Sequence, residues 1–262
     1  MCIQMITSVQ NIKIQRVRAL LGRRQEREAA RSFVVEGVRL AEEAQAAGLR
    51  PELVLYAAGL SVRGQSVLNA FAAAGAEIEE ATPGLLDGLS ATETSQGLLA
   101  VFPLQALPLP PYLDFVLIAD QVRDPGNLGT LLRSAAAAGV QAVLLAPGTT
   151  DAYAPKVLRS AMGAHFRLPL YRMDWDEIIQ VCKPRLKIYL AEAGAGTPCW
   201  QIDFRQAAAL VVGGEAEGAS PQARSVVDAL VTIPMPGKSE SLNAAIAASI
   251  LLFEIVRQRV TL

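Results

Sequence analysis

The C-terminal part of this chain repeats one pattern that leaves few folds open to it. A short apolar strand ends in a loop rich in glycine or proline, and a helix begins soon afterwards, at residues 115–138, 209–227 and 230–259. Strands that are apolar along their whole length are buried on both faces, so the pattern predicts a parallel sheet flanked by helices. Each loop leaves backbone groups unpaired at a strand end, and three such loops predict a binding site for a small polar ligand or cofactor.

A proline-rich segment marks the expected domain boundary. Residues 104–112 contain three prolines within four positions, which forbids a helix and favours a stiff, extended linker. We therefore expect one domain at residues 1–103 and a second at residues 113–262. The first should contain strands at 33–35, 53–56, near Ile78 and at 98–102, and helices at 12–21, 38–47 and 62–74. The second should also contain strands at 142–145 and 187–190, a short extended segment at 166–170, and helices at 155–161 and 174–181. This alternation predicts a small α/β sandwich followed by a larger α/β domain.

Composition restricts the class of protein further. Of the 262 residues, 52% are hydrophobic, which allows a large core, and 19% are charged, which argues against disorder. The longest apolar run, residues 244–253, is too short to cross a bilayer, and the N-terminus lacks the features of a signal peptide. The three cysteines are odd in number and far apart, so neither a disulfide framework nor a metal site is expected. We expect a cytoplasmic protein that binds neither a metal nor a membrane.

Charge is distributed unevenly along the chain. The formal net charge is −1 and the isoelectric point about 6.0, which alone disfavours a nucleic-acid partner. Basic residues nevertheless gather within residues 12–31, opposed there only by Glu26 and Glu28. They are Lys13, Arg16, Arg18, Arg23, Arg24, Arg27 and Arg31. Such a basic helical segment can contact phosphates, and the alternative is an ordinary solvated helix face.

The first of the three loops, residues 120–133, can be interpreted in two ways. A Pro-Gly turn follows the strand, and Asn127 is suited to cap the next helix. Arg133 lies one helical turn after Gly129, where the missing side chain would let a ligand approach the guanidinium. In the alternative, Asp124 and Asn127 are merely caps and Arg133 is an edge residue.

The other two loops exclude several familiar motifs. The glycines of residues 211–218 follow neither the dinucleotide fingerprint nor the P-loop pattern, so a nicotinamide or ATP enzyme is unsupported. In the third loop, Ser241 and Asn243 stand at the mouth of the last helix, and capping accounts for one of them. His165 is the only histidine and no nucleophile elbow is evident, so an acyl-transfer triad is not expected and His165 is interpreted as structural.

Taken together, the three loops resemble the motifs of a known enzyme family. Residues 124–134, 213–218 and 233–243 are similar, in order and spacing, to the three motifs of the SpoU (TrmH) branch of the SPOUT RNA methyltransferases. Four further segments resemble the substrate-binding domain often attached to these enzymes: residues 6–8, 11–13, 33–37 and 94–100. The resemblance implies a C-terminal α/β knot, with a deep trefoil knot and a mostly parallel sheet, after a smaller ribosomal-protein-like α/β sandwich.

The resemblance also implies an activity. Members of the family transfer a methyl group from S-adenosylmethionine to a ribose 2′-hydroxyl of structured RNA without a metal. They are usually homodimers through the C-terminal domain, with active sites built at the interface. We expect ribosomal RNA of the 23S type rather than transfer RNA as the substrate, because transfer-RNA members often carry helical extensions in place of this N-terminal domain. A non-catalytic RNA-binding or ribosome-assembly factor, and an enzyme that methylates a base, are the alternatives.

Carried over by position, the family motifs assign roles to individual residues. The implied catalytic residues are Asn127, Arg133, Ser241 and Asn243. The implied S-adenosylmethionine contacts, made through the backbone, are Leu190, Ala191, Gly213, Gly214, Ile233, Met235 and Leu242. In the basic segment we expect RNA contacts at Lys13, Arg16, Arg23, Arg24 and Arg27. The family assigns activation of the 2′-hydroxyl to Arg133, and because a guanidinium stays protonated, we expect it to stabilise the developing alkoxide and the adjacent phosphate.

Overall fold

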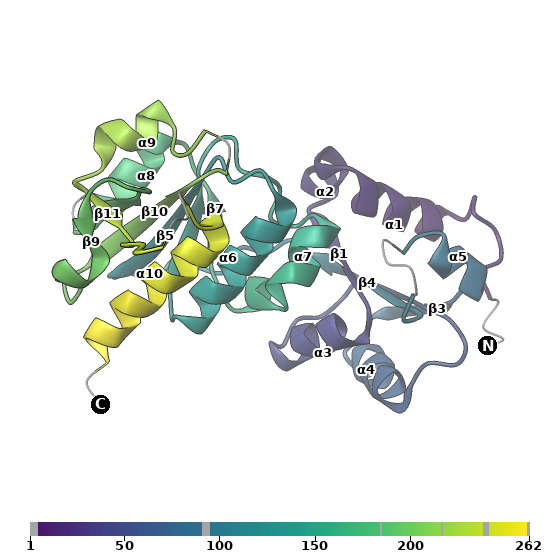
Figure 1. The fold of residues 1–262 in the computed structure, drawn as a ribbon. Helices are drawn as coiled ribbons and strands as arrows, with labels where there is room; N and C mark the ends of the chain where they lie inside the picture. The colour runs from purple at the N-terminus through teal and green to yellow at the C-terminus, as the bar shows by residue number, and fades with distance from the viewer. Residues whose placement is uncertain (1–4, 91–94, 184, 216, 238–240, 261–262) are drawn as a thin grey trace. The chain divides into compact units, whose positions relative to one another are not determined.

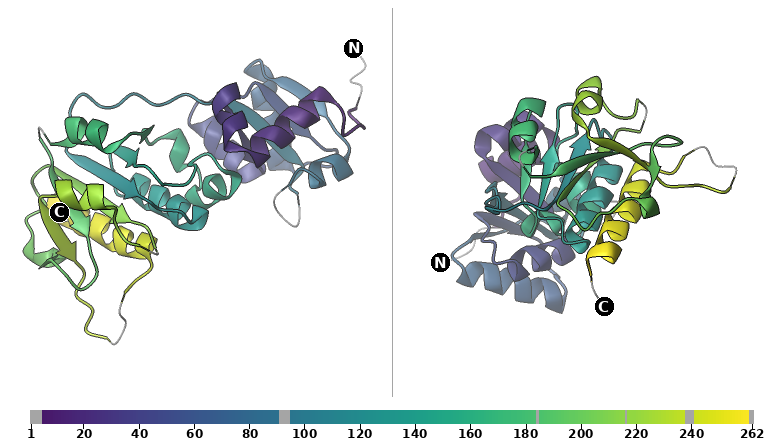
Figure 2. Two further views of the ribbon diagram at one scale, coloured as in Figure 1. Left: turned by 90° about the horizontal axis from the view of Figure 1, so that it is seen from above. Right: turned by 90° about the vertical axis from the view of Figure 1, so that its left-hand side faces the viewer.

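The computed structural model describes residues 5–90, 95–183, 185–215, 217–237 and 241–260. The chain forms two compact units. Unit 1 combines Met1–Gln105 with Tyr153–Phe166, and unit 2 combines Ala106–Ala152 with Arg167–Leu262. The chain therefore passes from one unit to the other at three points. Residues 104–112, the expected linker, form neither helix nor strand (Figure 2).

Unit 1 is built on a four-stranded sheet with the order β1-β4-β2-β3 (Figure 1). Its strands are β1 (Ser32–Glu36), β2 (Leu53–Tyr56), β3 (Glu77–Glu80) and β4 (Leu98–Pro103). β4 runs antiparallel to both β1 and β2, while β2 and β3 are parallel. The four predicted strands of this domain are confirmed within one or two residues at each end.

Helices cover both faces of this sheet because side chains alternate between the faces along each strand. α1 (Ile12–Gly22) and α5 (Pro83–Asp87) pack against one set of strand residues. α3 (Val38–Ala46) and α4 (Val62–Ala73) pack against the alternate set. A short helix, α2 (Arg24–Ala30), follows α1 after a single extended residue. The sandwich is thus confirmed, although α2 and α5 were not predicted as separate helices.

A segment that lies between two strands of unit 2 completes the core of unit 1. It contains α7 (Pro155–Ala161) and a 3-10 turn, η1 (Ala164–Phe166). The Tyr153 ring lies 5.0 Å from the Phe33 ring, and Phe166 lies 6.5 Å from the same ring. The expected extended segment at 166–170 was therefore wrong at its start, because Phe166 ends a 3-10 turn and the strand begins at Leu170. His165 is buried within η1.

Unit 2 contains a seven-stranded sheet with the order β7-β6-β5-β10-β8-β11-β9. Its strands are β5 (Phe115–Asp120), β6 (Ala142–Leu145), β7 (Leu170–Arg172), β8 (Lys187–Ala191), β9 (Thr197–Pro198), β10 (Ala208–Gly213) and β11 (Ala229–Thr232). Each pair of neighbours is parallel, as predicted. The carboxyl ends of β8, β10 and β11 consequently meet at one edge, and this order is consistent with the expected α/β knot.

Helices cover both faces of the larger sheet (Figure 1). α8 (Trp175–Cys182) and α9 (Pro221–Val226) pack against alternate residues of the central strands. α6 (Pro125–Ala137) and α10 (Ala244–Arg259) lie side by side on the other face, where Ser134 Oγ and Ser249 Oγ are hydrogen-bonded at 2.7 Å. A further 3-10 turn, η2 (Cys199–Gln201), follows β9. The helix after the first loop and the last helix of the chain are therefore direct neighbours.

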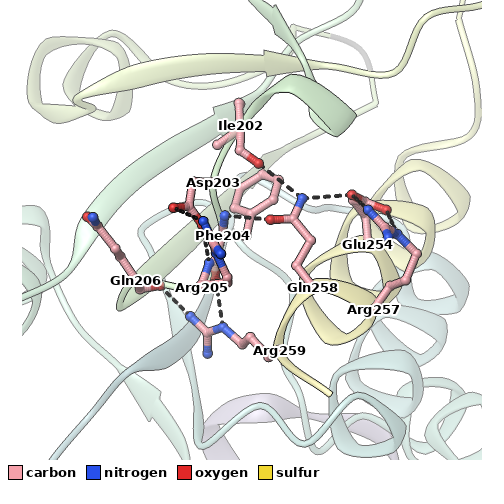
Figure 3. A network of polar contacts seen from close by, with 9 residues as sticks. All are labelled: Ile202, Asp203, Phe204, Arg205, Gln206, Glu254, Arg257, Gln258 and Arg259. Atoms are coloured by element: carbon pink, nitrogen blue, oxygen red, sulfur yellow. Dashed lines mark hydrogen bonds and ion pairs between the residues drawn. The ribbon is translucent and has the colours of Figure 1, made fainter. Parts of the chain in front are cut away.

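The C-terminal turn of α10 is tied to the segment 202–206 (Figure 3). The Gln258 side chain accepts a hydrogen bond from Phe204 N at 2.8 Å and donates one to the Ile202 carbonyl at 3.0 Å. Arg259 donates to the Phe204 carbonyl at 2.8 Å. At 16 residues α10 is the longest described helix. None of the helices in the described ranges is long and apolar enough to cross a membrane.

Candidate active site

A cavity of about 430 Å³ opens at the edge where β8, β10 and β11 end. The predicted cofactor residues that line it are Ala191, Gly213, Gly214, Ile233, Met235 and Leu242. Ser241 and Asn243, predicted as catalytic, line it as well. The structure thus brings together residues from the ends of three strands and from the third loop. Lys238, Ser239 and Glu240 of that loop lie outside the described residues.

Three predicted site residues are absent from the described lining of this cavity. Leu190 is fully buried in β8, where it is paired in register with Val211 of β10 and Leu230 of β11. Asn127 is hydrogen-bonded to two residues of the lining, Glu215 and Asn243. The Arg133 side chain is exposed on α6, and no hydrogen bond or ion pair joins this side chain to another described residue.

The two glycines at the end of β10 are required by close packing. A Cβ atom on Gly213 would lie 2.4 Å from the backbone nitrogen of Ala219, and one on Gly214 would lie 2.2 Å from the Gln121 carbonyl oxygen. Both distances are shorter than real Cβ contacts. Only glycine lets the loop after β10 fold back on itself and pass beside the loop after β5.

Buried polar contacts hold these two loops together. Asp120 ends β5 with no exposed surface, and its carboxylate accepts hydrogen bonds from Ser220 N at 2.6 Å and Ser220 Oγ at 3.2 Å. Gln121, the next residue, has a φ of 55°, a left-handed conformation that costs a non-glycine residue about 1 kcal/mol or more. The Asp120–Ser220 contact thus connects the end of β5 to the start of α9.

The cap of α6 confirms one of the two expected cap residues and not the other. Asp124, not Asn127, is the N-cap residue, and its carboxylate accepts a hydrogen bond from Asn127 N at 2.8 Å. The interpretation of Asn127 as a cap was therefore wrong. Its side chain is instead available to the other loops: Nδ2 donates to Glu215 Oε1 at 2.7 Å, and Oδ1 accepts from Asn243 Nδ2 at 2.9 Å. One side chain from each loop thus enters a continuous hydrogen-bonded chain.

Glu215 was not among the predicted site residues, although it lies within the second motif. The signal available in the sequence was an acidic residue directly after the two glycines of a strand-end loop. Asn243 was expected either to cap the last helix or to belong to the site, and it caps α10 while also lining the cavity. Its Oδ1 caps α10 by accepting from Ala245 N at 3.0 Å and Ile246 N at 3.2 Å. Its Nδ2 joins the Glu215–Asn127–Asn243 chain.

The basic segment of unit 1 is mostly engaged in intramolecular contacts. Lys13 is paired with Glu77 and Glu79, which raises its pKa chiefly through the hydrogen bond to Glu77. Arg16 is paired with Glu52, and Arg24 with Glu28. Arg27 is 4% exposed and donates to the carbonyl of Leu20 near the end of α1, so it is not displayed to a ligand. Of the predicted RNA contacts, Arg23 alone is exposed without a side-chain partner in the part of the chain that is described.

The chemistry of the cavity is that of an organic-ligand site. Its walls are apolar side chains and strand-end backbone, with Ser241 and Asn243 as neutral polar groups and Glu192 and Glu215 as the charged residues among those described. Within the described ranges, no three histidine, cysteine, aspartate or glutamate residues are placed to hold a metal ion. Such a cavity suits a ligand with a planar apolar part and several hydrogen-bonding groups.

A parallel α/β sheet with a small-molecule cavity at the carboxyl ends of its strands defines a class of cofactor-binding folds. The model of the SpoU rRNA Methylase family matches residues 114–253, which is more than half of the chain. The chain belongs to this family. The model of the MRM3-like substrate binding domain matches residues 11–100.

Relatives match along almost the whole chain. The 23S rRNA (guanosine(2553)-2′-O)-methyltransferase RlmP of Bacillus subtilis is 32% identical over 95% of this chain and 98% of its own length. The 23S rRNA (uridine(2479)-2′-O)-methyltransferase of Streptomyces viridochromogenes is 34% identical, with 98% and 93% covered. The crystal structure of AviRb from the same organism, in complex with AdoMet, superposes with a TM-score of 0.86 at 32% identity, with 95% and 98% covered.

Proposed function

We propose that this protein transfers a methyl group from S-adenosylmethionine to a ribose 2′-hydroxyl of ribosomal RNA. The observation that carries the proposal is the Glu215–Asn127–Asn243 chain, which joins the three loops beside the cavity. An amide held from both sides is a preorganised polar group, as the alignment of a hydroxyl with a methyl donor requires. Family membership supports the same reaction.

The residues present fit S-adenosylmethionine. The cavity volume of about 430 Å³ lies within the range of small-molecule sites. Backbone groups of Ala191, Gly213 and Ile233 would bind the polar edge of the adenine, and apolar walls such as Leu251 would cover its faces. The close packing at Gly213 keeps main chain rather than side chain at this wall. The AdoMet complex of AviRb supports the choice of ligand.

When bound, S-adenosylmethionine supplies an electrophilic methyl group whose bond to sulfur breaks as the ribose oxygen attacks. The residues of the chain act on that oxygen. Asn127 and Asn243 orient the ribose beside the cavity, and Ser241 offers a hydroxyl from the lining. Arg133 stays cationic and stabilises the developing alkoxide, while the hydroxyl proton passes to a phosphate oxygen of the RNA or to water.

We also propose that two copies form a homodimer through α10. Its exposed apolar residues are Ile246, Ile250 and Phe253, and their spacing of four and three residues places them on one face. Ile246 and Phe253 are 52% and 48% exposed. Arg133 lies on the neighbouring helix α6 and outside the described lining of the cavity of its own subunit. Burying this face against a second copy would let Arg133 act at the cavity of the partner subunit.

Ribosomal RNA is the substrate that the comparisons favour. Both full-length relatives described above carry 23S rRNA in their names, and unit 1 contains the substrate-binding match. Among the predicted RNA contacts of unit 1, we propose Arg23 as a primary phosphate contact, because Lys13 and Arg16 would first have to leave their carboxylate partners. The cytoplasmic location stays a prediction.

The experiment is a transfer assay with labelled S-adenosylmethionine and separated ribosomal and transfer RNA. Label in ribosomal RNA that blocks alkaline cleavage at the 3′ phosphate supports the proposal, whereas alkali-sensitive label indicates a base methylase. Label in transfer RNA alone reverses the choice of substrate, and label in neither refutes methyl transfer.

A variant separates an enzyme from a binding factor. Arg133→Ala should bind S-adenosylmethionine as the wild type does in calorimetry, because Arg133 does not line the described cavity, yet transfer should fall by at least about 100-fold. RNA binding without transfer by the wild type would favour the assembly factor.

For the dimer, Ile250→Glu should sediment as a monomer, and wild-type protein that is monomeric at micromolar concentration would contradict the interface.

A further inference from the structure

One charged group in the cavity has no part in the transfer step. Glu192 directly follows Ala191, the last residue of β8, and is one of the residues that line the cavity. Its backbone N donates to the Val231 carbonyl at 2.9 Å, so the neighbouring strand β11 holds the residue in place. The side chain is 25% exposed. A carboxylate that is largely withdrawn from water requires a partner.

Part of that requirement is met by Arg224 of α9. The Arg224 Nη1 atom lies 2.8 Å from Glu192 Oε2. The same guanidinium lies beside Gly218, where its Nη2 would be 3.4 Å from an added Cβ. Arg224 therefore sets Glu192 against the loop after β10, and Glu192 and Gly218 both line the cavity. The ion pair thus joins Glu192, at the end of β8, to α9.

The other carboxylate residue in the lining, Glu215, already has a hydrogen-bond partner from another loop. Glu215 accepts the hydrogen bond from Asn127 at 2.7 Å and belongs to the side where the ribose of RNA is to react. Glu192 adjoins Ala191, which is among the proposed adenosine contacts. The group of S-adenosylmethionine bonded directly to adenine is its own ribose, which carries two neighbouring hydroxyls. A carboxylate at the end of a parallel strand is a known acceptor for ribose hydroxyls in other nucleotide-binding sheets.

We propose that Glu192, oriented by Arg224, accepts hydrogen bonds from the ribose hydroxyls of the methyl donor and thereby selects ribonucleoside donors. This inference rests on the proposed function. Hydrogen bonds from hydroxyls to a carboxylate are charge-assisted, and their loss should weaken binding about 10- to 100-fold. Because the proposed hydrogen bonds are made to the methyl donor, their loss should lower the affinity for that donor.

The test is a binding cycle with two competitors, adenosine and 2′,3′-dideoxyadenosine, against S-adenosylmethionine. Wild-type protein should prefer adenosine by about tenfold or more, and Glu192→Ala should bind the two competitors equally. Glu192→Gln, which retains one acceptor oxygen, should keep part of the preference. Glu217→Gln is the matched control, since Glu217 is also paired with an arginine but is not in the described lining. It should behave as the wild type.

Two outcomes overturn the assignment. If Glu192→Ala retains the full preference for adenosine, the ribose is held elsewhere. If Glu192→Ala weakens S-adenosylmethionine but leaves both competitors unchanged, the carboxylate serves the methionine part of the donor instead. Thermal unfolding of each variant verifies that the unit remains folded. Wild-type protein that binds no S-adenosylmethionine would refute the proposed function itself, which is a separate result.

Discussion

The two tasks of the Asn243 side chain can be separated by a pair of substitutions. Asn243→Ala removes the cap on Ala245 N and Ile246 N and also the donor to Asn127. Loss of an N-cap costs about 1 kcal/mol, and loss of a neutral hydrogen bond costs about 1 kcal/mol more. We expect this variant to unfold at a lower temperature by roughly 4–8 °C, at about 2–4 °C per kcal/mol. Methyl transfer should fall as well.

Asn243→Asp is the matched control. An aspartate caps a helix as well as an asparagine does and adds a favourable charge at the helix N-terminus, so stability should stay within about 1 kcal/mol of the wild type. The variant loses the Nδ2 donor, however. The Oδ1 atom of Asn127 would then face the new carboxylate at position 243 without a donor, unless the Asn127 amide turns over and loses its hydrogen bond to Glu215. Either choice breaks the Glu215–Asn127–Asn243 chain, and transfer should fall about 10- to 100-fold, which corresponds to roughly 1.4–2.7 kcal/mol.

Differential scanning calorimetry and single-turnover transfer assays on the same preparations make the comparison. The expected order of stability is wild type and Asn243→Asp together, then Asn243→Ala. The expected order of activity places both variants well below the wild type. An Asn243→Asp protein with wild-type activity would refute the role of the hydrogen-bonded chain. One as unstable as Asn243→Ala would refute the account of the cap.

Three further predictions address the cavity, the core and a buried thiol. Gly214→Ala should abolish S-adenosylmethionine binding in calorimetry, because its Cβ would lie 2.2 Å from the Gln121 carbonyl oxygen and displace the loop, while Gly237→Ala, with nothing within 4 Å, should bind normally. Leu158→Ala removes a 1% exposed side chain and should destabilise unit 1 by about 2–5 kcal/mol, so hydrogen exchange should accelerate in β1 and α3 but not in β5 or β10. Burial raises the pKa of the Cys182 thiol to about 12, so at pH 8 Ellman's reagent should label it in a Cys2→Ser, Cys199→Ser background only after unfolding. The raised pKa also links folding to pH. In the unfolded chain the Cys182 thiol ionises near pH ~8.5, so burial of the neutral thiol contributes fully to stability below that pH, and the contribution is lost as the pH rises towards 12.

Periodicity in the sequence was sufficient for most of the fold. The strands predicted at 53–56 and 142–145 and the helix at 155–161 match β2, β6 and α7 at both ends. The two strands are short and strongly apolar, and the helix starts at a proline. In these segments the local conformational preference and the pattern of burial predict the same secondary structure. β9, by contrast, has two residues and is defined by its pairing with β11, which no local pattern contains.

The site was predictable to the extent that parallel strands end at one edge. Ala191, Gly213 and Ile233 line the cavity for this reason. Leu190 does not, because it comes one residue before the end of β8 and its side chain is buried in the sheet. The charge of Arg27 suited it to contact a phosphate, yet its side chain donates a hydrogen bond to a carbonyl near the end of α1. A tertiary contact of this kind cannot be predicted from the distribution of charge along the sequence. The place of Glu215 in the site could not be predicted, because it depends on the contact with the Asn127 side chain.

The three crossings of the chain between the units have a consequence for protein engineering. A recombinant fragment that starts after residue 112 would carry Tyr153, Leu158 and Phe166 without the strands against which they pack. The complementary fragment, residues 1–103, would lack one wall of its own hydrophobic interior. Swapping the N-terminal half between homologues at the proline-rich segment should therefore yield poorly folded chimeras unless residues 153–166 are exchanged along with it.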